Sequence, residues 1–334
     1  MQKHLSIIVP VYKVEKYIRP CFESIFQQGL SDDIYEIIVV NDGTPDHSME
    51  VVADLLEQHN NITIINQENQ GLSVARNTAL ACATGEYILM LDSDDLLVEN
   101  SLPLILKKAI NSKADIVMAD FLKMEEEELR MPIHLPAPKV IEWKEKTGKQ
   151  FFVEELNPRE CYVWRSVYRR EFLQSHHIQF VPGIYYQDVP FTHECYLYAR
   201  KCLRTNLLLT IYRQRGDSTQ AHYTMKHARD FSIAIGKTWL LRKNEGISPE
   251  EYRKLQADVF CSFYSMMRTT LYFMPSFKDR LHTMQFLAEN APDLRFTDGR
   301  TQKMISFLYH LSPYLLMSVL SLRWKWHHRK TAKK

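Results

Sequence analysis

The first 120 residues alternate short apolar runs with stretches in which apolar residues recur at helical spacing, and this alternation constrains the fold most. Residues 5–11 are apolar almost throughout, which is typical of a strand buried on both faces. Further strands are predicted in the same way at residues 36–40, 62–65, 87–91 and 116–119, with helices between them. This order predicts an α/β fold with a mainly parallel sheet, flanked by helices and joined by right-handed crossovers.

The alternation stops after the fifth strand. Residues 123–149 hold an acidic run and three prolines, and we expect an exposed excursion or hairpin there. Residues 163–173 are predicted to be helical, and a second helix and a strand are predicted at residues 190–199 and 207–212. From residue 226 onward the pattern is helical throughout.

We therefore expect two domains. Residues 1–220 would form the sheet domain, and residues 221–334 a helical C-terminal region with an amphipathic, basic tail. A hydrophobic fraction of 45% and a charged fraction of 25% are ordinary for a globular protein, so extensive disorder is not expected. The formal net charge of +2 gives no reason to expect nucleic acid as a partner.

The six cysteines are scattered without a C-x-x-C pair, which argues against a zinc site or a disulfide framework. The N-terminus runs straight into the first strand pattern and lacks the apolar stretch of a signal peptide. We therefore expect a cytoplasmic protein.

Polar clusters follow three of the predicted strands. Pro10-Val11-Tyr12 closes the first strand, Asn41-Asp42-Gly43 the second and Asp92-Ser93-Asp94-Asp95 the fourth. A single aspartate in such a place is usually a turn former or a helix N-cap. Three clusters at the carboxyl ends of parallel strands, however, predict one ligand-binding rim, since ligands of open α/β sheets bind there.

The chemistry of this rim points to a diphosphate held through a cation. No G-x-G-x-x-G or G-x-x-x-x-G-K-[ST] motif is present, which disfavours a dinucleotide oxidoreductase on a similar sheet. Asp92 and Asp94 are separated by one residue and can share Mn²⁺ or Mg²⁺, which binds one or two carboxylates together with substrate phosphates. Asp95 is expected to cap a following helix.

Four segments in order resemble the successive motifs of family 2 glycosyltransferases, which have the GT-A fold. They are LSIIVPVY at residues 5–12, EIIVVNDG at 36–43, NQGLSVARN at 69–77 and GEYILMLDSDD at 85–95. Three later segments resemble the acceptor-side segments of the family and the segment that closes its catalytic domain: VYRREF at 167–172, YQDVPF at 186–191 and YRQRGDS at 212–218. The resemblance covers roughly residues 1–220, and the helical C-terminal third is outside it.

The resemblance implies a set of donor-site residues. Asp42 would accept a hydrogen bond from a uracil ring, Asp94 would be the metal ligand, and Asp92 would contact both metal and ribose. The remaining members of the nucleotide-binding set are Pro10, Tyr12, Glu15, Arg76 and Ser93.

Asp188 matches the catalytic base of the family. The family commonly has Glu-Asp at this point, whereas this sequence has Gln187-Asp188. A helix N-cap ahead of Pro190 is the alternative role for Asp188, and the rings of Tyr185 and Tyr186 before it are of the kind that stack on sugars. Two arginines in the closing segment, Arg213 and Arg215, are expected to contact phosphates or to lie on the surface.

The C-terminal region carries an apolar stretch at residues 305–322 that His310 and Pro313 interrupt. Its eighteen residues are borderline for a membrane span, and the interruptions argue against one. Trp324 and Trp326 follow among lysines and arginines, a composition typical of a membrane interface. We expect peripheral attachment to the inner face of the cell membrane, with a core helix packed on the catalytic domain as the alternative.

Together these observations predict an inverting, metal-dependent glycosyltransferase of the hexosyltransferase type. It would move a sugar from a nucleotide-diphosphate donor, UDP-linked, to a hydroxyl of a glycan or lipid-linked glycan in bacterial surface polysaccharide synthesis. A non-catalytic scaffold that binds nucleotide sugar or glycan is the alternative, and Gln187 is the residue that favours it. The identities of the sugar, the acceptor and the linkage stay open.

Overall fold

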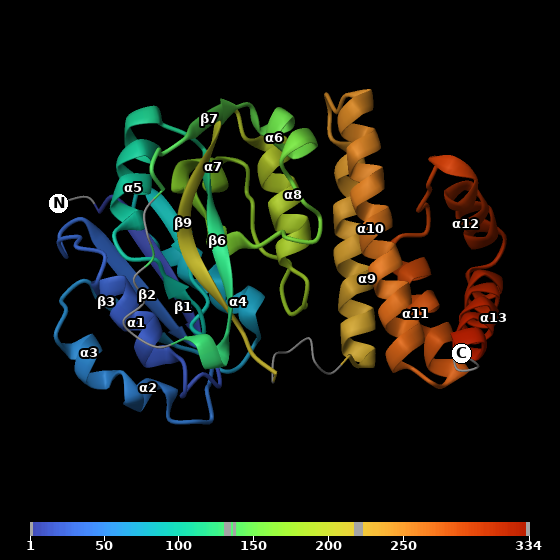
Figure 1. Ribbon diagram of the computed structural model, residues 1–334, viewed down its shortest axis with the longest axis horizontal. Coiled ribbons are helices and arrows are strands. Elements are labelled where there is room, and N and C mark those ends of the chain that lie inside the picture. The colour runs from blue at the N-terminus through green and yellow to red at the C-terminus, as the bar shows by residue number, and fades with distance from the viewer. Residues whose placement is uncertain (1–2, 130–134, 136–137, 217–222, 332–334) are drawn as a thin grey trace. The chain divides into compact units, whose positions relative to one another are not determined.

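The computed structural model of the chain describes residues 3–129, 135, 138–216 and 223–331, with side chains of the last helix described up to residue 325. The chain forms two compact units (Figure 1). The first comprises residues 1–154, 162–183 and 195–218, and the second comprises residues 155–161, 184–194 and 219–334. The expected division into a catalytic domain at residues 1–220 and a C-terminal region at residues 221–334 stays a prediction.

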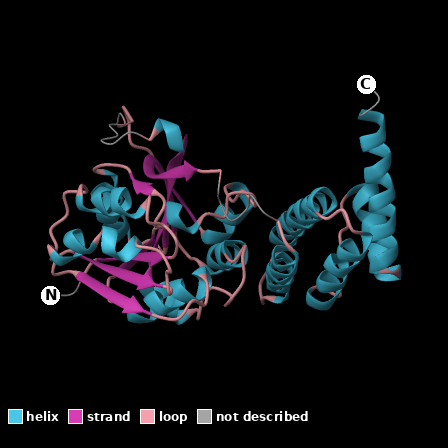
Figure 2. Cartoon of the chain, turned by 90° about the horizontal axis from the view of Figure 1, so that it is seen from below, coloured by secondary structure: helices cyan, strands magenta, loops and turns pink. Residues whose placement is uncertain are grey.

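In the described residues, nine strands form one sheet, and all of them belong to the first unit (Figure 2). The strand order is β3-β2-β1-β4-β8-β6-β9-β5, and β7 pairs with β9. Pairing is parallel among β1 to β4 and between β6 and β9, and it is antiparallel wherever β5, β7 or β8 takes part. The strands are β1 Leu5–Val11, β2 Tyr35–Asn41, β3 Ile62–Asn66, β4 Tyr87–Met90, β5 Leu96–Leu97, β6 Ile116–Glu125, β7 Trp143–Lys146, β8 Ser166–Arg169 and β9 Cys202–Gln214.

Helices cover both faces of this sheet. Successive strand residues point to opposite faces, so Ile7 and Val9 of β1 enter one apolar core together with Phe22 of α1 and Leu106 of α5. Helix α4 also contacts β1 and β2, but its buried residues are outside that core, so it covers the other face. The helices of this part of the chain are α1 Ile18–Phe26, α2 Ser48–Val51, α3 Ala53–Glu57, α4 Leu72–Cys82, α5 Ser101–Ser112, α6 Gly148–Glu154, α7 Arg170–Ser175 and α8 Asp188–Tyr198.

The helix predicted at residues 163–173 is wrong. This segment forms a short 3-10 turn at Val163–Arg165, then β8, then α7. β8 lies between β4 and β6, where Val167 pairs with Leu89 on one side and Val117 on the other. The backbone hydrogen bonds to two neighbouring strands decide the conformation, and no local pattern reveals those neighbours.

The excursion predicted at residues 123–149 contains regular structure. β6 continues to Glu125, a 3-10 turn follows at Glu126–Glu128, and β7 pairs with β9. Residues 130–134 and 136–137, with two of the three prolines, lie outside the described residues.

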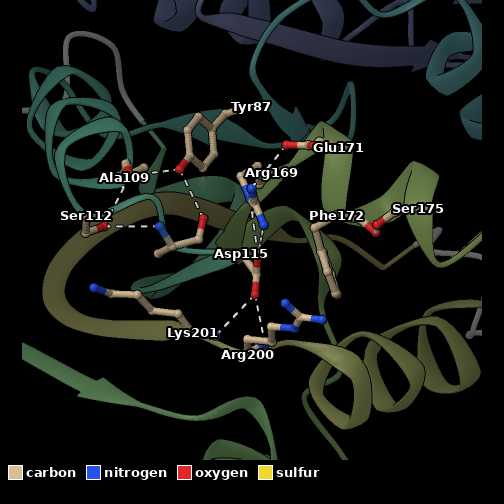
Figure 3. A network of polar contacts seen from close by, with 11 residues as sticks. Tyr87, Ala109, Ser112, Asp115, Arg169, Glu171, Phe172, Ser175, Arg200 and Lys201 are labelled. Atoms are coloured by element: carbon tan, nitrogen blue, oxygen red, sulfur yellow. Dashed lines mark hydrogen bonds and ion pairs between the residues drawn. The ribbon is translucent and has the colours of Figure 1, made fainter.

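A buried carboxylate ties three strands together at the amino end of β6. Asp115 is 2% exposed, and its Oδ1 accepts a 3.1 Å hydrogen bond from Nε of Arg169, at the end of β8 (Figure 3). Its Oδ2 accepts the backbone N–H groups of Arg200 (2.8 Å) and Lys201 (3.1 Å), just before β9. A cavity of about 280 Å³ borders this network, at the sheet edge opposite the aspartates of residues 92–95.

The C-terminal part of the second unit is helical, as predicted. Ser248 caps the longest of these helices, because its Oγ accepts from the Glu251 N–H (3.2 Å) while Glu251 accepts from the Ser248 N–H (2.9 Å). Within the described part of the chain, none of the helices combines the length and apolarity needed to cross a membrane. The helices are α9 Met225–Leu240, the 3-10 turn Leu241–Lys243, α10 Pro249–Phe273, α11 Phe277–Asn290, α12 Gly299–Leu311 and α13 Pro313–Thr331.

Pro313 explains why the apolar stretch at residues 305–322 is split. It is the first residue of α13, a position where the missing N–H of proline costs nothing. The α/β sheet flanked by helices and the helical C-terminal extension are thus confirmed.

Candidate active site

The three polar clusters lie together at the carboxyl ends of the parallel strands. The register pairs Val11 of β1 with Asn41 of β2, and Ile8 of β1 with Met90 of β4. Tyr12, Asp42 and Asp92 therefore all follow strands that run in the same direction and end together. This is the edge at which α/β proteins bind ligands.

Two arginines pair with the first two aspartates of the segment Asp92-Ser93-Asp94-Asp95. Nη2 of Arg76 lies 2.6 Å from Oδ1 of Asp92, and the Arg76 side chain is fully buried. Nη2 of Arg215 lies 2.9 Å from Oδ2 of Asp94. Asp92 and Asp94 are therefore each paired with a guanidinium. Arg76 contacts this segment through the carboxylate of Asp92.

The predicted helix-capping role of Asp95 is wrong. Asp95 precedes strand β5, and its Oδ1 accepts a 2.9 Å hydrogen bond from the backbone N–H of Arg213 in β9. Leu96 pairs with Ile211 just beyond it. Oδ2 of Asp95 is buried, and no hydrogen-bond partner for it exists among the described residues.

Burial and neighbouring carboxylates raise the pKa values of two of these aspartates, Asp94 and Asp95. Burial, followed by the charge of Asp92, raises the pKa of Asp94, while Arg215 opposes that rise. Burial and the charges of Asp94 and Asp92 raise the pKa of Asp95 well above its ordinary value. A cation bound beside these carboxylates would favour their charged forms and offset this rise.

These residues fit a hard divalent cation that is bound together with phosphate. Among the described residues, no group of three histidine, cysteine, aspartate or glutamate side chains could hold a metal ion by itself. Mg²⁺ and Mn²⁺ commonly take only one or two carboxylates and complete their coordination with substrate phosphates and water. Asp94 and Asp92 are the residues that would hold such an ion.

Asp42 is buried and organises the loop that follows β3. Its Oδ1 accepts hydrogen bonds from Nε2 of Gln67 (2.7 Å) and N of Gln70 (2.9 Å), and its Oδ2 accepts from N of Gly71 (2.9 Å). A carboxylate has about four acceptor positions, so Asp42 can still accept from a ligand.

The other predicted donor-site residues differ in exposure. Pro10 is buried within β1 and Ser93 is 5% exposed. The ring of Tyr12 is 42% exposed, with Nζ of Lys13 lying 5.3 Å from its centre. Glu15 is exposed, and its Oε2 accepts from the backbone N–H of His47 (3.2 Å).

The two arginines of the closing segment are not surface residues. Nε of Arg213 donates to the backbone O of Asp94 (2.8 Å), and its side chain is buried. The guanidinium carbons of Arg213 and Arg215 lie 5.0 Å and 4.9 Å from the centre of the Tyr17 ring. Sequence reasoning left open which of these arginines would contact the site, and the structure brings both to it.

Asp188 belongs to the second unit and is the first residue of α8. Before it, Tyr185 stacks on His227 at 4.5 Å between ring centres, and Tyr186 stacks on Phe231 at 4.1 Å. The two rings expected to stack on a sugar thus stack on α9. Gln187 is 4% exposed, and its Oε1 has no hydrogen-bond partner in the described part of the chain.

The family assignment follows from comparison with known proteins. The model of the family described as glycosyl transferase family 2 matches residues 6–176, which include the strands and polar clusters of the rim. The chain belongs to glycosyl transferase family 2.

Curated relatives of this glycosyltransferase agree with the assignment. It is 36% identical over 216 residues to EpsJ of Bacillus subtilis, an uncharacterized glycosyltransferase, and the match covers 64% of this chain and 62% of EpsJ. It is 30% identical over 254 residues to the glycosyltransferase GlyA of Streptococcus pneumoniae, covering 74% of this chain and 36% of GlyA. The chain thus spans less than two thirds of the length of these two relatives.

A solved structure shares the fold of this glycosyltransferase. Residues 1–349 of TarS from S. aureus, solved in complex with UDP-GlcNAc, match with a TM-score of 0.71 at 19% identity, covering 97% of this chain and 92% of that one. The GT-A-like fold expected from the sequence is confirmed.

Proposed function

We propose that this glycosyltransferase moves a sugar from a UDP-linked donor to a hydroxyl of a glycan or lipid-linked glycan acceptor, with inversion at the anomeric carbon. The observation that carries the proposal is the segment Asp92–Asp95, where three close carboxylates at the carboxyl edge of the sheet meet Arg76 and Arg215. The complex of TarS with UDP-GlcNAc supports the choice of donor class.

The donor half of the reaction uses residues at the carboxyl ends of the parallel strands. Asp94 and Asp92 would hold Mn²⁺ or Mg²⁺, which supplies Lewis-acid stabilisation of the charge on the leaving diphosphate. Asp42 accepts a hydrogen bond from the uracil ring. Pro10, Tyr12, Glu15, Arg76 and Ser93 complete the nucleotide-binding set.

We assign one residue, Asp188, to the acceptor half of the reaction. Its carboxylate takes the proton of the attacking acceptor hydroxyl, a step that typically accelerates a reaction by about 10²–10⁴-fold. A single displacement inverts the anomeric carbon, needs one such base and forms no covalent intermediate.

Donor turnover and nucleotide binding in matched variants test the proposal. Asp188→Asn should abolish sugar transfer and leave UDP affinity unchanged, as measured by calorimetry. Asp279→Asn is the matched control, because Asp279 is likewise a half-buried aspartate in the first turn of a helix of the second unit. Sugar transfer that survives in Asp188→Asn would remove Asp188 from the role of base.

A scaffold that binds nucleotide sugar without turning it over is the second candidate. The amide of Gln187, buried beside Asp188, replaces the acid that commonly stands there in the family. The wild-type chain decides between the two: UDP binding without hydrolysis of any donor in a panel of UDP-sugars, with Mn²⁺ or Mg²⁺ present, would favour the scaffold.

We further propose that α12 and α13 attach the protein peripherally to the inner face of the cell membrane. One side of these helices packs inside its unit through Tyr309 and Met317, which are nearly fully buried. Other apolar side chains are exposed, with Phe307 at 66%, Leu311 at 62% and Leu322 at 69%, and Arg323 and Lys325 follow. Apolar groups beside cations suit a surface of anionic lipid. The basic residues at 329, 330, 333 and 334 lie outside the described side chains.

Vesicle sedimentation tests this attachment. The full chain should bind vesicles rich in phosphatidylglycerol and not vesicles of phosphatidylcholine alone, and Phe307→Ser with Leu311→Ser should weaken binding. Tyr264→Ser, which removes an exposed ring from α10, is the control. Absence of sedimentation with the phosphatidylglycerol vesicles would contradict the attachment, and equal sedimentation with both lipids would contradict the role of the cations.

A further inference from the structure

The end of β9 is fixed onto the segment Asp92–Asp95 by Arg213. The backbone N–H of Arg213 donates to Oδ1 of Asp95 (2.9 Å), and its Nε donates to the backbone O of Asp94 (2.8 Å). Neither bond uses a carboxylate oxygen of Asp92 or Asp94. Arg213 therefore positions the segment and leaves both of these carboxylates available.

Arg215, two residues further on, occupies a carboxylate oxygen instead. Its Nη2 lies 2.9 Å from Oδ2 of Asp94, and the two side chains are 16% and 23% exposed. Because a cation bound at Asp94 needs the charge of the same carboxylate, the guanidinium and the cation compete. The ring of Tyr17, 4.9 Å from the Arg215 guanidinium, adds a weakly attractive surface for positive charge.

We propose that Arg215 is the internal counter-ion of Asp94 in the donor-free protein and gives up this carboxylate when a divalent cation and the nucleotide diphosphate bind together. The inference rests on the proposed function. A diphosphate offers Arg215 a new anionic partner that its planar guanidinium can bind with two hydrogen bonds. The cost of leaving Asp94 is then offset only when the nucleotide is present.

The two arginine–aspartate pairs of the site differ in a way that supports this division. Arg76 is fully buried, so its pair with Asp92 is fixed by the surrounding packing. Arg215 lies just beyond the end of β9 and is followed by Gly216, where an added Cβ would meet no atom of the described residues within 4 Å. A glycine at this position allows the backbone beside Arg215 more conformations than any other residue would.

Exchange of this kind makes cation and nucleotide binding cooperative. Each ligand should raise the affinity of the other by the same factor, because coupling free energies are reciprocal. Without the nucleotide, the ion pair with Arg215 should hold the affinity for the cation low.

Binding of Mn²⁺ to the full chain, followed by the electron paramagnetic resonance signal of free Mn²⁺, tests the inference. The wild-type chain should bind Mn²⁺ weakly alone and more tightly with UDP. Arg215→Gln should raise the affinity for Mn²⁺ alone by about 5-fold or more, within the usual range of coupling between sites, and should reduce the gain from UDP. Arg215→Lys, which keeps the charge, should bind Mn²⁺ alone as weakly as the wild type.

Arg19→Gln is the matched control, since it removes an arginine from an exposed pair with Asp54 and should leave Mn²⁺ affinity unchanged. Equal or weaker Mn²⁺ binding by Arg215→Gln without UDP, in a variant with wild-type circular dichroism, overturns the inference. If that variant and the wild type still bind UDP and turn over donor, the proposed function stands without it. Absence of UDP binding in the wild type would instead overturn both.

Discussion

Arg76, whose side chain is fully buried, donates a 2.6 Å hydrogen bond from Nη2 to Oδ1 of Asp92. Its guanidinium carbon also lies 5.2 Å from the centre of the Phe180 ring. Helix α4, which carries Arg76, thus fixes the orientation of Asp92. Under the proposed function, Arg76 would act on the donor through Asp92.

Replacing Arg76 should therefore affect stability and donor binding together. Arg76→Met keeps the length of the side chain but leaves Asp92 without its partner, and we expect a loss of about 3 kcal/mol in unfolding free energy, since breaking a buried pair costs about that much. UDP affinity should also fall. Urea denaturation and calorimetry check the two effects. UDP affinity equal to wild type in a folded variant would contradict this role.

Gly43, directly after Asp42, should not tolerate a side chain. Its φ is +63°, and an added Cβ would lie 2.9 Å from the backbone N of Asn69. Gly43→Ala should cost about 2 kcal/mol in unfolding free energy through left-handed strain and this contact, and should weaken UDP binding by displacing the loop that Asp42 holds. Gly183→Ala is the control, because Gly183 also has a positive φ (+72°) but its added Cβ would meet no described atom within 4 Å. A loss of stability in Gly43→Ala no larger than in the control would rule out the steric part.

Asp258 should be essential for the stability of the second unit. Oδ2 of Asp258 lies 3.2 Å from Nε2 of the fully buried His193, and its carboxylate accepts from Nζ of Lys254 at 2.6 and 2.7 Å. Asp258→Ala removes the buried carboxylate that His193 and Lys254 share, so the unfolding free energy should fall by about 3 kcal/mol. Because His193 is on α8 with Asp188, sugar transfer should also fall.

Chemical denaturation followed by circular dichroism measures this effect. Asp54→Ala, which removes an exposed pair with Arg19, should cost less than about 1 kcal/mol. Equal costs for the two substitutions would mean that burial adds nothing to the Asp258 network.

Glu36 should make stability depend on acid pH. Burial opposes its charge, but hydrogen bonds from Ser6, Thr84 and Gly85 to Oε1 outweigh burial and lower the pKa of Glu36. A carboxylate with a lowered folded pKa stabilises the protein above its unfolded pKa of about 4.3, and this contribution is lost as the pH falls through the folded value.

Glu36→Gln should therefore be less stable than wild type by about 1 kcal/mol at pH 7, and the difference should shrink as the pH falls below about 4. Urea denaturation at several pH values measures the difference. Glu57→Gln, at an exposed position of α3, is the control. A difference that is constant with pH would show that the charge of Glu36 is not involved.

The sequence by itself determined the first half of the sheet and the place of the candidate site. Parallel strands buried on both faces are apolar in their own right, so β1, β2 and β4 can be recognised locally. Their carboxyl ends necessarily share one edge, and the aspartates at residues 42, 92 and 94 could be assigned to that edge before any contact was known.

The tertiary structure decided the features that depend on contacts with a distant segment of the chain. Asp95 follows the pattern of a helix cap, yet strand β9 meets it and supplies the N–H of Arg213. Residues 166–169 become a strand only because β4 and β6 lie on either side. The ion pair between Asp94 and Arg215 joins residues more than a hundred positions apart. The local sequence reveals the periodicity of its apolar residues and hence the type of each element. The partners of Asp95, Asp94 and residues 166–169 depend instead on packing between distant segments.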